Sequence, residues 1–158
     1  MEEKIVVGVD GSPVSRTALR WAVEEAGLRG CAVEAVLAWH LDYGLVIGPV
    51  SATVAAGVDP ERLRENHRRV LADLVAEVGG DVRPVLAEGD ARDVLVKASE
   101  DATLLVVGSR GAGPIRGALL GSVSSYCVNH ASCPVVVVRA TEPAADEPKP
   151  VIAPGPLL

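Results

Sequence analysis

Short apolar runs alternate along the chain with stretches in which apolar residues recur at helical spacing. The apolar runs predict buried β-strands, at residues 5–9, 33–39, 82–87, 104–107 and 135–138. The helical stretches predict helices that follow Ser12, Asp59 and Asp90, and a further helix from about Ser122 to Ala131. This alternation predicts an open α/β sheet that is parallel throughout and joined by right-handed crossovers.

Local signals indicate where the helices begin and end. Ser12-Pro13 and Asp59-Pro60 each place a capping side chain before a proline, which is typical of a helix start. Glycines within residues 27–30 and 79–80 predict the ends of the first two helices. The second helix has one apolar stripe, predicted to face the core: Leu63, His67, Val70, Leu71, Leu74, Val75 and Val78.

Two segments differ from this pattern, and one predicted strand contains a proline. Residues 40–58 lack periodicity and predict a long mobile loop on the ligand side of the sheet. Residues 140–158 hold five of the 11 prolines and predict a flexible tail after one α/β domain at residues 1–139. Pro84 cannot donate to a strand ladder, so strand 82–87 is expected at or near a sheet edge.

Composition narrows the class of protein. Of the 158 residues, 49% are hydrophobic but only 3% aromatic, with no Phe, so Val, Leu, Ile and Ala must build the core, as suits a buried parallel sheet. The net charge of −6 argues against a nucleic-acid binder. The three cysteines lack metal-ligand spacing, and the sequence shows neither a signal peptide nor an apolar run long enough to span a membrane. These features predict a cytoplasmic protein that does not bind membranes. Arg far outnumbers Lys among the 15 basic residues, a hint of a GC-rich bacterial genome.

Candidate chemistry lies just after the predicted strands, because ligands of open parallel sheets bind beyond the carboxyl ends of the strands. Asp10-Gly11-Ser12 follows the first strand, Trp39 ends the second, and a glycine-rich stretch begins at Gly108 after the fourth. Gly121-Ser122-Val123-Ser124 then opens a helix. A helix N-terminus presents N–H groups and partial positive charge, so this stretch predicts an anion site.

The spacing Gly108-x2-Gly111-x9-Gly121-Ser122 fits the G-x2-G-x9-G-[S/T] signature of nucleotide-binding universal stress proteins. The resemblance extends to Val-Gly-Val-Asp-Gly-Ser (7–12), Val-Val-Gly-Ser-Arg-Gly (106–111), Leu-Leu-Gly-Ser-Val-Ser (119–124) and Cys-Pro-Val-Val-Val-Val-Arg (133–139). It implies a Rossmann-like five-stranded parallel sheet in the order 3-2-1-4-5, with two helices on each face. It also implies ATP as ligand, with AMP or another adenine nucleotide as alternatives, and Mg²⁺ accompanying the nucleotide.

The resemblance further implies roles for individual residues. Asp10 would lie near the ribose, the phosphates or a bound metal, and the main chain near Trp39 would meet the adenine edge. Gly108 and Gly111 would border the ribose and phosphates, and residues 121–124 would hold the phosphates. The expected binding set is Val9, Asp10, Gly11, Ser12, Trp39, Gly108, Ser109, Arg110, Gly111, Gly121, Ser122, Val123 and Ser124, with Asp10 also the candidate metal ligand.

Catalytic signals are sparse. There is no P-loop lysine between residues 98 and 148, and no histidine stands at a motif-defined distance from Ser109 or Ser122. His67 and His130 are expected in structural roles, and Arg110 either pairs with phosphate or is solvated. The sequence therefore favours a nucleotide-binding regulatory stress-response protein over a slow metal-dependent ATPase. A homodimer through strand 135–138 is expected in either case. A third hypothesis is a purely structural dimer that binds no ligand.

Overall fold

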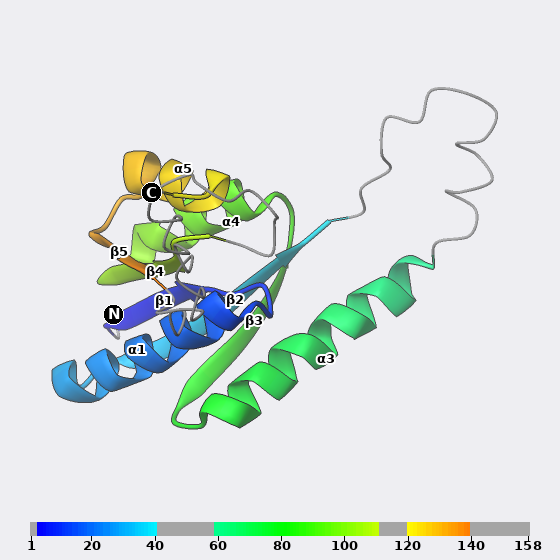
Figure 1. Ribbon diagram of the computed structural model, residues 1–158, viewed down its shortest axis with the longest axis horizontal. Helices are drawn as coiled ribbons and strands as arrows, with labels where there is room; N and C mark the ends of the chain where they lie inside the picture. The colour runs from blue at the N-terminus through cyan, green and yellow to red at the C-terminus, as the bar shows by residue number, and fades with distance from the viewer. Residues whose placement is uncertain (1–2, 41–58, 111–119, 140–158) are drawn as a thin grey trace, which may run out of the picture.

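The computed structural model describes residues 3–40, 59–110 and 120–139. Within them one sheet holds the strands in the order β3-β2-β1-β4-β5, and every neighbouring pair is parallel (Figure 1). The strands are β1 (Lys4–Gly8), β2 (Ala32–Trp39), β3 (Val82–Glu88), β4 (Leu104–Gly108) and β5 (Val135–Val138). The predicted fold class and strand order are confirmed, and each predicted strand is present.

Two helices cover each face of the sheet in the described part of the chain. The helices are α1 (Pro13–Arg29), α3 (Pro60–Val78), α4 (Ala91–Ala98) and α5 (Ser122–His130), and a 3-10 turn, η1 (Ser99–Asp101), follows α4. Helices α1 and α3 pack on one face, where Leu19, Leu71 and Leu74 join the apolar core. Helices α4 and α5 pack on the other through Leu95 and Cys127. All four helices begin at the carboxyl edge of the strands, so their N-termini gather at one edge of the sheet.

The expected caps form. The Ser12 side chain accepts a hydrogen bond from the Ser15 N–H at 3.2 Å, and the Asp59 carboxylate accepts one from the Glu61 N–H at 3.0 Å. Each is followed by a proline in the first helical turn. The predicted stop within residues 27–30 is confirmed: α1 continues through Gly27 and ends where Gly30 adopts a left-handed φ of 70°.

Strand β3 lies at one edge of the sheet, as the proline within it predicts, and β5 lies at the other. The apolar stripe of α3 is buried at Leu71 and Leu74, but Val70 is 43% exposed, so its predicted place in the core is wrong. A Cβ added to Gly11 would lie 2.9 Å from Val70 Cγ1, which places Val70 over the β1–α1 turn rather than over the sheet.

The three cysteines are free thiols. Cys127 is fully buried between α5 and the sheet, and burial raises the pKa of its thiol to about 11. At neutral pH it is therefore a protonated, small apolar side chain, as predicted for it. In the described ranges no helix is long and apolar enough to cross a membrane, and no three His, Cys, Asp or Glu side chains gather as a metal site.

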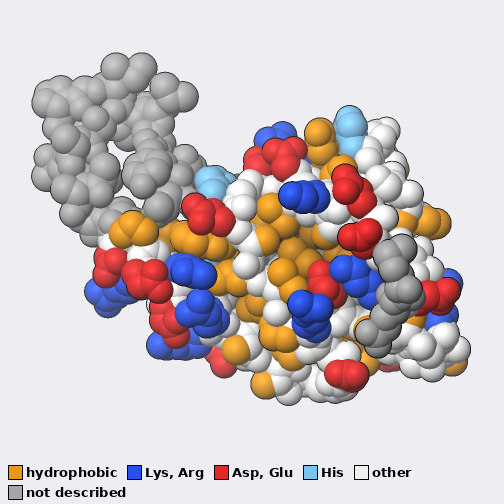
Figure 2. Space-filling view, turned by 180° about the vertical axis from the view of Figure 1, so that it is seen from behind, with side chains coloured by type: hydrophobic (Ala, Val, Ile, Leu, Met, Phe, Trp, Pro, Cys, Tyr) orange, Lys and Arg blue, Asp and Glu red, His pale blue; other side chains and the backbone are white. Residues whose placement is uncertain are grey.

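Charges of both signs are mixed on the surface. On the face in Figure 2, Lys and Arg side chains stand beside Asp and Glu around a central group of hydrophobic side chains. Ion pairs such as Arg20–Glu77 at 2.9 Å and Arg68–Glu65 at 2.8 Å also place opposite charges side by side on the helices. The face shown therefore presents no continuous basic surface for a polyanion.

Candidate functional site

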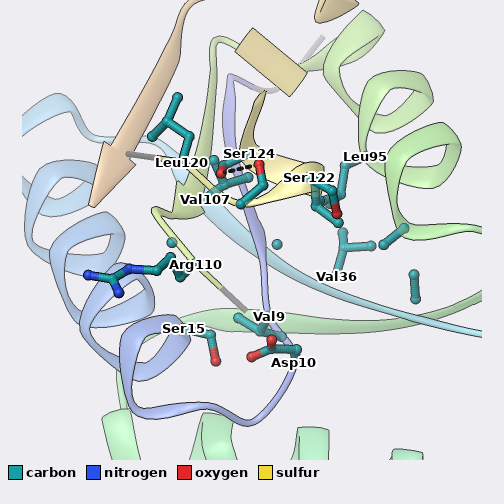
Figure 3. Close-up of a pocket in the computed structure, with 16 residues that line it drawn as sticks. Val9, Asp10, Ser15, Val36, Leu95, Val107, Arg110, Leu120, Ser122 and Ser124 are labelled. Carbon is teal, nitrogen blue, oxygen red and sulfur yellow. Dashed lines mark hydrogen bonds between the residues drawn. The ribbon is translucent and has the colours of Figure 1, made fainter. Parts of the chain in front are cut away.

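A cleft of about 320 Å³ opens at the carboxyl edge of the sheet, between the ends of the central strands β1 and β4 (Figure 3). Here the strand order reverses: from β1 the chain continues outward to β2 and β3 on one side, and from β4 to β5 on the other. Open α/β sheets bind their ligands at this switch point. The lining residues come from three strands, three helices and the segments that connect them: Gly8, Val9, Asp10, Ser15, Val36, Ala38, Ala91, Leu95, Val107, Gly108, Arg110, Leu120, Gly121, Ser122, Val123 and Ser124.

The cleft combines an apolar wall with a few polar groups. Val9, Val107 and Leu95 are buried and supply much of the apolar surface, while Asp10 and Arg110 bring charges of opposite sign. A small ligand site typically has this composition, in which apolar walls give affinity and a few polar groups fix orientation.

The β1–α1 turn places the carboxylate at the cleft. The Asp10 Oδ1 atom accepts a hydrogen bond from the Ser12 N–H at 2.9 Å, which closes the turn. Gly11 between them has a φ of 82°, a left-handed conformation that a side chain would strain. Gly11 and Ser12 therefore shape the turn, whereas Asp10 itself lines the cleft.

The β4–α5 side is held by hydrogen bonds to Ser109. Its carbonyl accepts the Gly121 N–H at 2.7 Å and the Ser124 hydroxyl at 3.1 Å. Its own N–H donates to the Val138 carbonyl at 2.8 Å. Because these bonds fix the first residues of α5 against the end of β4, the start of the helix faces the cleft in a defined orientation.

The start of α5 differs electrostatically from its neighbours at this edge. An Asp90 carboxylate caps α4, and Asp10 lies just before α1, so both helix starts have a negative charge nearby. Helix α5 begins after Gly121, with no side-chain cap and no acidic residue in its first turn. The Ser125 N–H donates to the Gly121 carbonyl, and the Ser122, Val123 and Ser124 N–H groups precede that first intrahelical bond. An anion at this helix start meets backbone donors and an uncompensated dipole.

Most of the sequence-predicted binding residues come together here. The cleft is lined by Val9, Asp10, Gly108, Arg110, Gly121, Ser122, Val123 and Ser124. Gly11, Ser12 and Ser109 lie in the adjoining turns and do not line it. Gly111 and the predicted loop lie outside the described residues, as does the predicted tail.

Trp39 does not line the cleft. Its side chain is 7% exposed in the core under α1 and α3, with its ring centroid 6.2 Å from that of His67. Its carbonyl accepts the Gly89 N–H at 2.8 Å. Ala38 lines the cleft instead, because neighbouring residues of a strand point to opposite faces.

Eight lining residues were not predicted: Gly8, Ser15, Val36, Ala38, Ala91, Leu95, Val107 and Leu120. Val36 and Ala38 share one face of β2, a period of two that the sequence does contain. Ala91 and Leu95 are four residues apart and so share a face of α4. No sequence signal says that this face reaches the cleft rather than the sheet alone.

His67 on α3 and His130 on α5 have structural contacts. The His67 Nδ1 lies 2.8 Å from the Leu63 carbonyl, and the His130 Nδ1 lies 2.9 Å from the Tyr126 carbonyl. Each contact joins residues four apart on one helix, and neither ring lines the cleft. Among the described lining residues, Asp10 is the one carboxylate and Arg110 the one cationic side chain.

Asp90 is the carboxyl whose acidity the structure changes most clearly. Hydrogen bonds from the Arg92 side chain and N–H hold its pKa at about 2, below the usual 3.8. A lowered pKa stabilises the fold above the unfolded value near 4, and this contribution is lost as pH falls toward 2.

Asp90→Asn should therefore lower the free energy of unfolding by about 0.5 kcal/mol at pH 6, the size of an exposed ion pair. Asn also caps helices well, so the cap is retained. Urea unfolding of both proteins between pH 6 and pH 2.5 measures the difference, which should shrink below pH 4. A difference that stays constant across the series would contradict this account.

Comparisons with known proteins bear on the site. The model of the universal stress protein family matches residues 1–139. A curated universal stress protein of Mycolicibacterium smegmatis is 36% identical over 154 residues, which cover 92% of this chain and 51% of that protein. The chain spans about half the length of the curated relatives it matches.

Solved structures include two similar proteins with ligands. A universal stress protein in complex with cAMP is 26% identical with a TM-score of 0.57, over 87% of this chain and 96% of that chain. A universal stress protein from Archaeoglobus fulgidus in complex with dAMP is 26% identical with a TM-score of 0.55, over 86% of this chain and 97% of that chain.

Proposed function

The chain belongs to the universal stress protein family, and we propose that it is an ATP-binding regulatory protein whose ligand occupies the cleft between β1 and β4. The phosphates would lie at the start of α5, and the base and ribose against the apolar wall. The main support is the start of α5, where Ser122, Val123 and Ser124 line the cleft and no acidic residue caps the helix. Two similar proteins, solved with cAMP and dAMP, add support for an adenine nucleotide.

Mass spectrometry of small molecules released by denaturing the purified protein, followed by titration calorimetry with ATP and AMP, tests this proposal. We expect an adenine nucleotide to be released, or ATP to bind after its removal, with AMP weaker because it offers fewer phosphate oxygens. If neither nucleotide binds to the stripped protein, the proposal is wrong.

The donor set fits a nucleotide-bound Mg²⁺ at Asp10. Mg²⁺ is commonly held by one or two carboxylates together with substrate phosphates, and Asp10 supplies one carboxylate at the cleft. Bound there, the ion would neutralise phosphate charge, and Asp10 would orient it through a carboxylate oxygen.

Asp10→Ala should therefore weaken ATP binding mainly when Mg²⁺ is present. Asp10→Asn serves as the matched variant, since its amide oxygen can still accept the Ser12 N–H but carries no charge. Calorimetry with Mg²⁺ and with EDTA gives the two affinities. An equal loss in both conditions for both variants would show that Asp10 acts on the nucleotide and not through the metal.

Binding is better supported than turnover. The lining residues include no His or Lys among those described, and Asp10 is the one candidate base. A slow metal-dependent ATPase remains the second candidate, because that carboxylate stands in the cleft. Steady-state phosphate release from ATP, measured with and without Mg²⁺, distinguishes the regulatory protein from the ATPase. We expect no release above that in buffer for a regulatory protein. Metal-dependent release that Asp10→Ala abolishes would establish the ATPase.

We also propose a homodimer through β5. This strand lies at the sheet edge with Val135–Val138 half-buried, so its outer hydrogen-bonding groups can pair with a second copy. Antiparallel pairing about a two-fold axis closes the assembly at two chains. Light scattering at micromolar protein should give the mass of a dimer. Pro134 and Val138 bond to β4, so the alternate residue Val137 directs its N–H to the open edge. Val137→Pro should therefore give a monomer, because proline cannot join a second ladder there. A monomer mass for the parent at every concentration would refute the pairing.

A further inference from the structure

A row of four side chains lies on the outer surface of α4 and α5. The Arg92 guanidinium donates to both oxygens of Asp90, each at 2.9 Å, and lies 5.8 Å from the centre of the Tyr126 ring. The His130 ring stacks on Tyr126 with centroids 4.0 Å apart and planes inclined at 17°. Asp90 thus orients the Arg92 guanidinium, which lies over the Tyr126 ring of the other helix.

The Arg92–Tyr126 contact crosses between two helices that both line the cleft. On α4, Arg92 is next to Ala91, which lines the cleft together with Leu95. On α5, Tyr126 lies one helical turn beyond Ser122, a residue of the proposed phosphate site. The contact is therefore close to the cleft while neither side chain lines it.

The opposite end of α4 is fixed by a different bond. The fully buried Ser99 hydroxyl oxygen accepts the Ser132 N–H at 2.9 Å and donates to the Val96 carbonyl at 2.6 Å. Ser99 directly follows α4, and Ser132 lies beyond the end of α5. A helix of eight residues is about 12 Å long, so α4 is anchored to the α5 side at its far end by this bond and at its cleft end by Arg92 and Tyr126.

We propose that Arg92 and Tyr126 are positioning residues that hold the cleft end of α4 against α5 and so set the cleft width for the ligand. Without their contact, we expect the first turn of α4 to move more about the end fixed at Ser99. Ala91 would then move away from the phosphate-binding helix start, while Leu95 stays packed in the core. The inference rests on the proposed nucleotide function for its consequence in binding, but the restraint on α4 is a property of the protein without ligand.

Tyr126→Leu tests the restraint, with Tyr126→Phe as the matched variant. Phe keeps the ring face that attracts the guanidinium, whereas Leu keeps the apolar bulk but has no ring. Hydrogen exchange of the nucleotide-free protein should become faster in residues 91–95 in the Leu variant and remain at the parent rate in the Phe variant. Lys97→Ala, an exposed change late in α4, should leave exchange in these residues unchanged.

ATP affinity is measured on the same variants. The Leu variant should bind ATP roughly threefold more weakly than the parent, as expected for one exposed cation–π contact, and the Phe variant as well as the parent. Equal exchange in the Leu and Phe variants would overturn the restraint, and faster exchange with unchanged affinity would overturn the positioning role. If the parent binds no nucleotide, the proposed function fails, and exchange alone decides whether the contact restrains α4.

Discussion

Replacing Gly121 with Val should abolish ATP binding and leave the fold intact. Gly121 is the residue before α5, with φ −73° and ψ 171°, a backbone conformation that any residue adopts. A Cβ there would lie 3.4 Å from the Arg110 Cα, 3.5 Å from the Ser109 carbonyl oxygen and 3.7 Å from the Ser124 Oγ, all ordinary contact distances. The protein therefore accommodates the first carbon, and the two valine methyl groups extend it where the helix start faces the ligand.

Titration calorimetry with ATP compares the parent, Gly121→Val and a control, Gly27→Val. A Cβ on Gly27 meets no atom within 4 Å, so the control adds the same side chain far from the cleft. Circular dichroism and urea unfolding check that both variants fold. Unchanged affinity in a folded Gly121→Val protein would show that the phosphates bind elsewhere.

Leu105→Ala should be the most destabilising of the substitutions considered. Leu105 lies on β4 between β1 and β5, is fully buried, and packs in the core under α4 and α5. Truncating a buried Leu removes its apolar burial and leaves a cavity, a cost of about 3 kcal/mol in the free energy of unfolding.

The same substitution at Leu28 is the control. Leu28 is 85% exposed near the end of α1, so truncation there removes almost no buried surface. Its unfolding free energy should stay within about 0.5 kcal/mol of the parent. Urea unfolding of the three proteins gives the values. Similar losses at the two positions would mean that Leu105 does not lie in a close-packed core.

The sheet was predictable because local signals agree with the global fold. Five apolar runs of strand length alternate with helical stretches, and the caps at Ser12 and Asp59 mark where α1 and α3 begin. Among the described strands, the one proline, Pro84 in β3, marks an edge of the sheet. Gly30 marks the end of α1 as predicted, and Gly27 lies inside the helix, where an exposed position tolerates glycine at a modest cost.

The lining of the cleft was predictable only at the loops that connect strands to helices. Asp10 lies just beyond β1, Gly108 ends β4 and Gly121 precedes α5, so their place at the carboxyl edge follows from the fold class alone. Leu95 reaches the same cleft from the middle of a helix, and its position depends on how α4 packs against β1. A Cβ on Gly8 would lie 2.7 Å from Leu95 Cδ1, so this close approach needs a glycine in the strand and leaves no pattern in the helix. Trp39 and Val70 show the same limit: the pattern places a residue on an element, but packing decides which neighbour it meets.

The hydrogen bonds at Ser109 join the proposed ligand site to the edge of the sheet. Its carbonyl accepts from Gly121 at the start of α5, and its N–H donates to Val138, the last residue of β5. One peptide segment is thus shared by the binding turn and by the strand proposed to pair with a second copy. Linkage makes any coupling through this segment reciprocal: if nucleotide tightens pairing by some factor, pairing tightens nucleotide binding by the same factor. Nucleotide concentration and protein concentration would then act as two inputs to a single equilibrium.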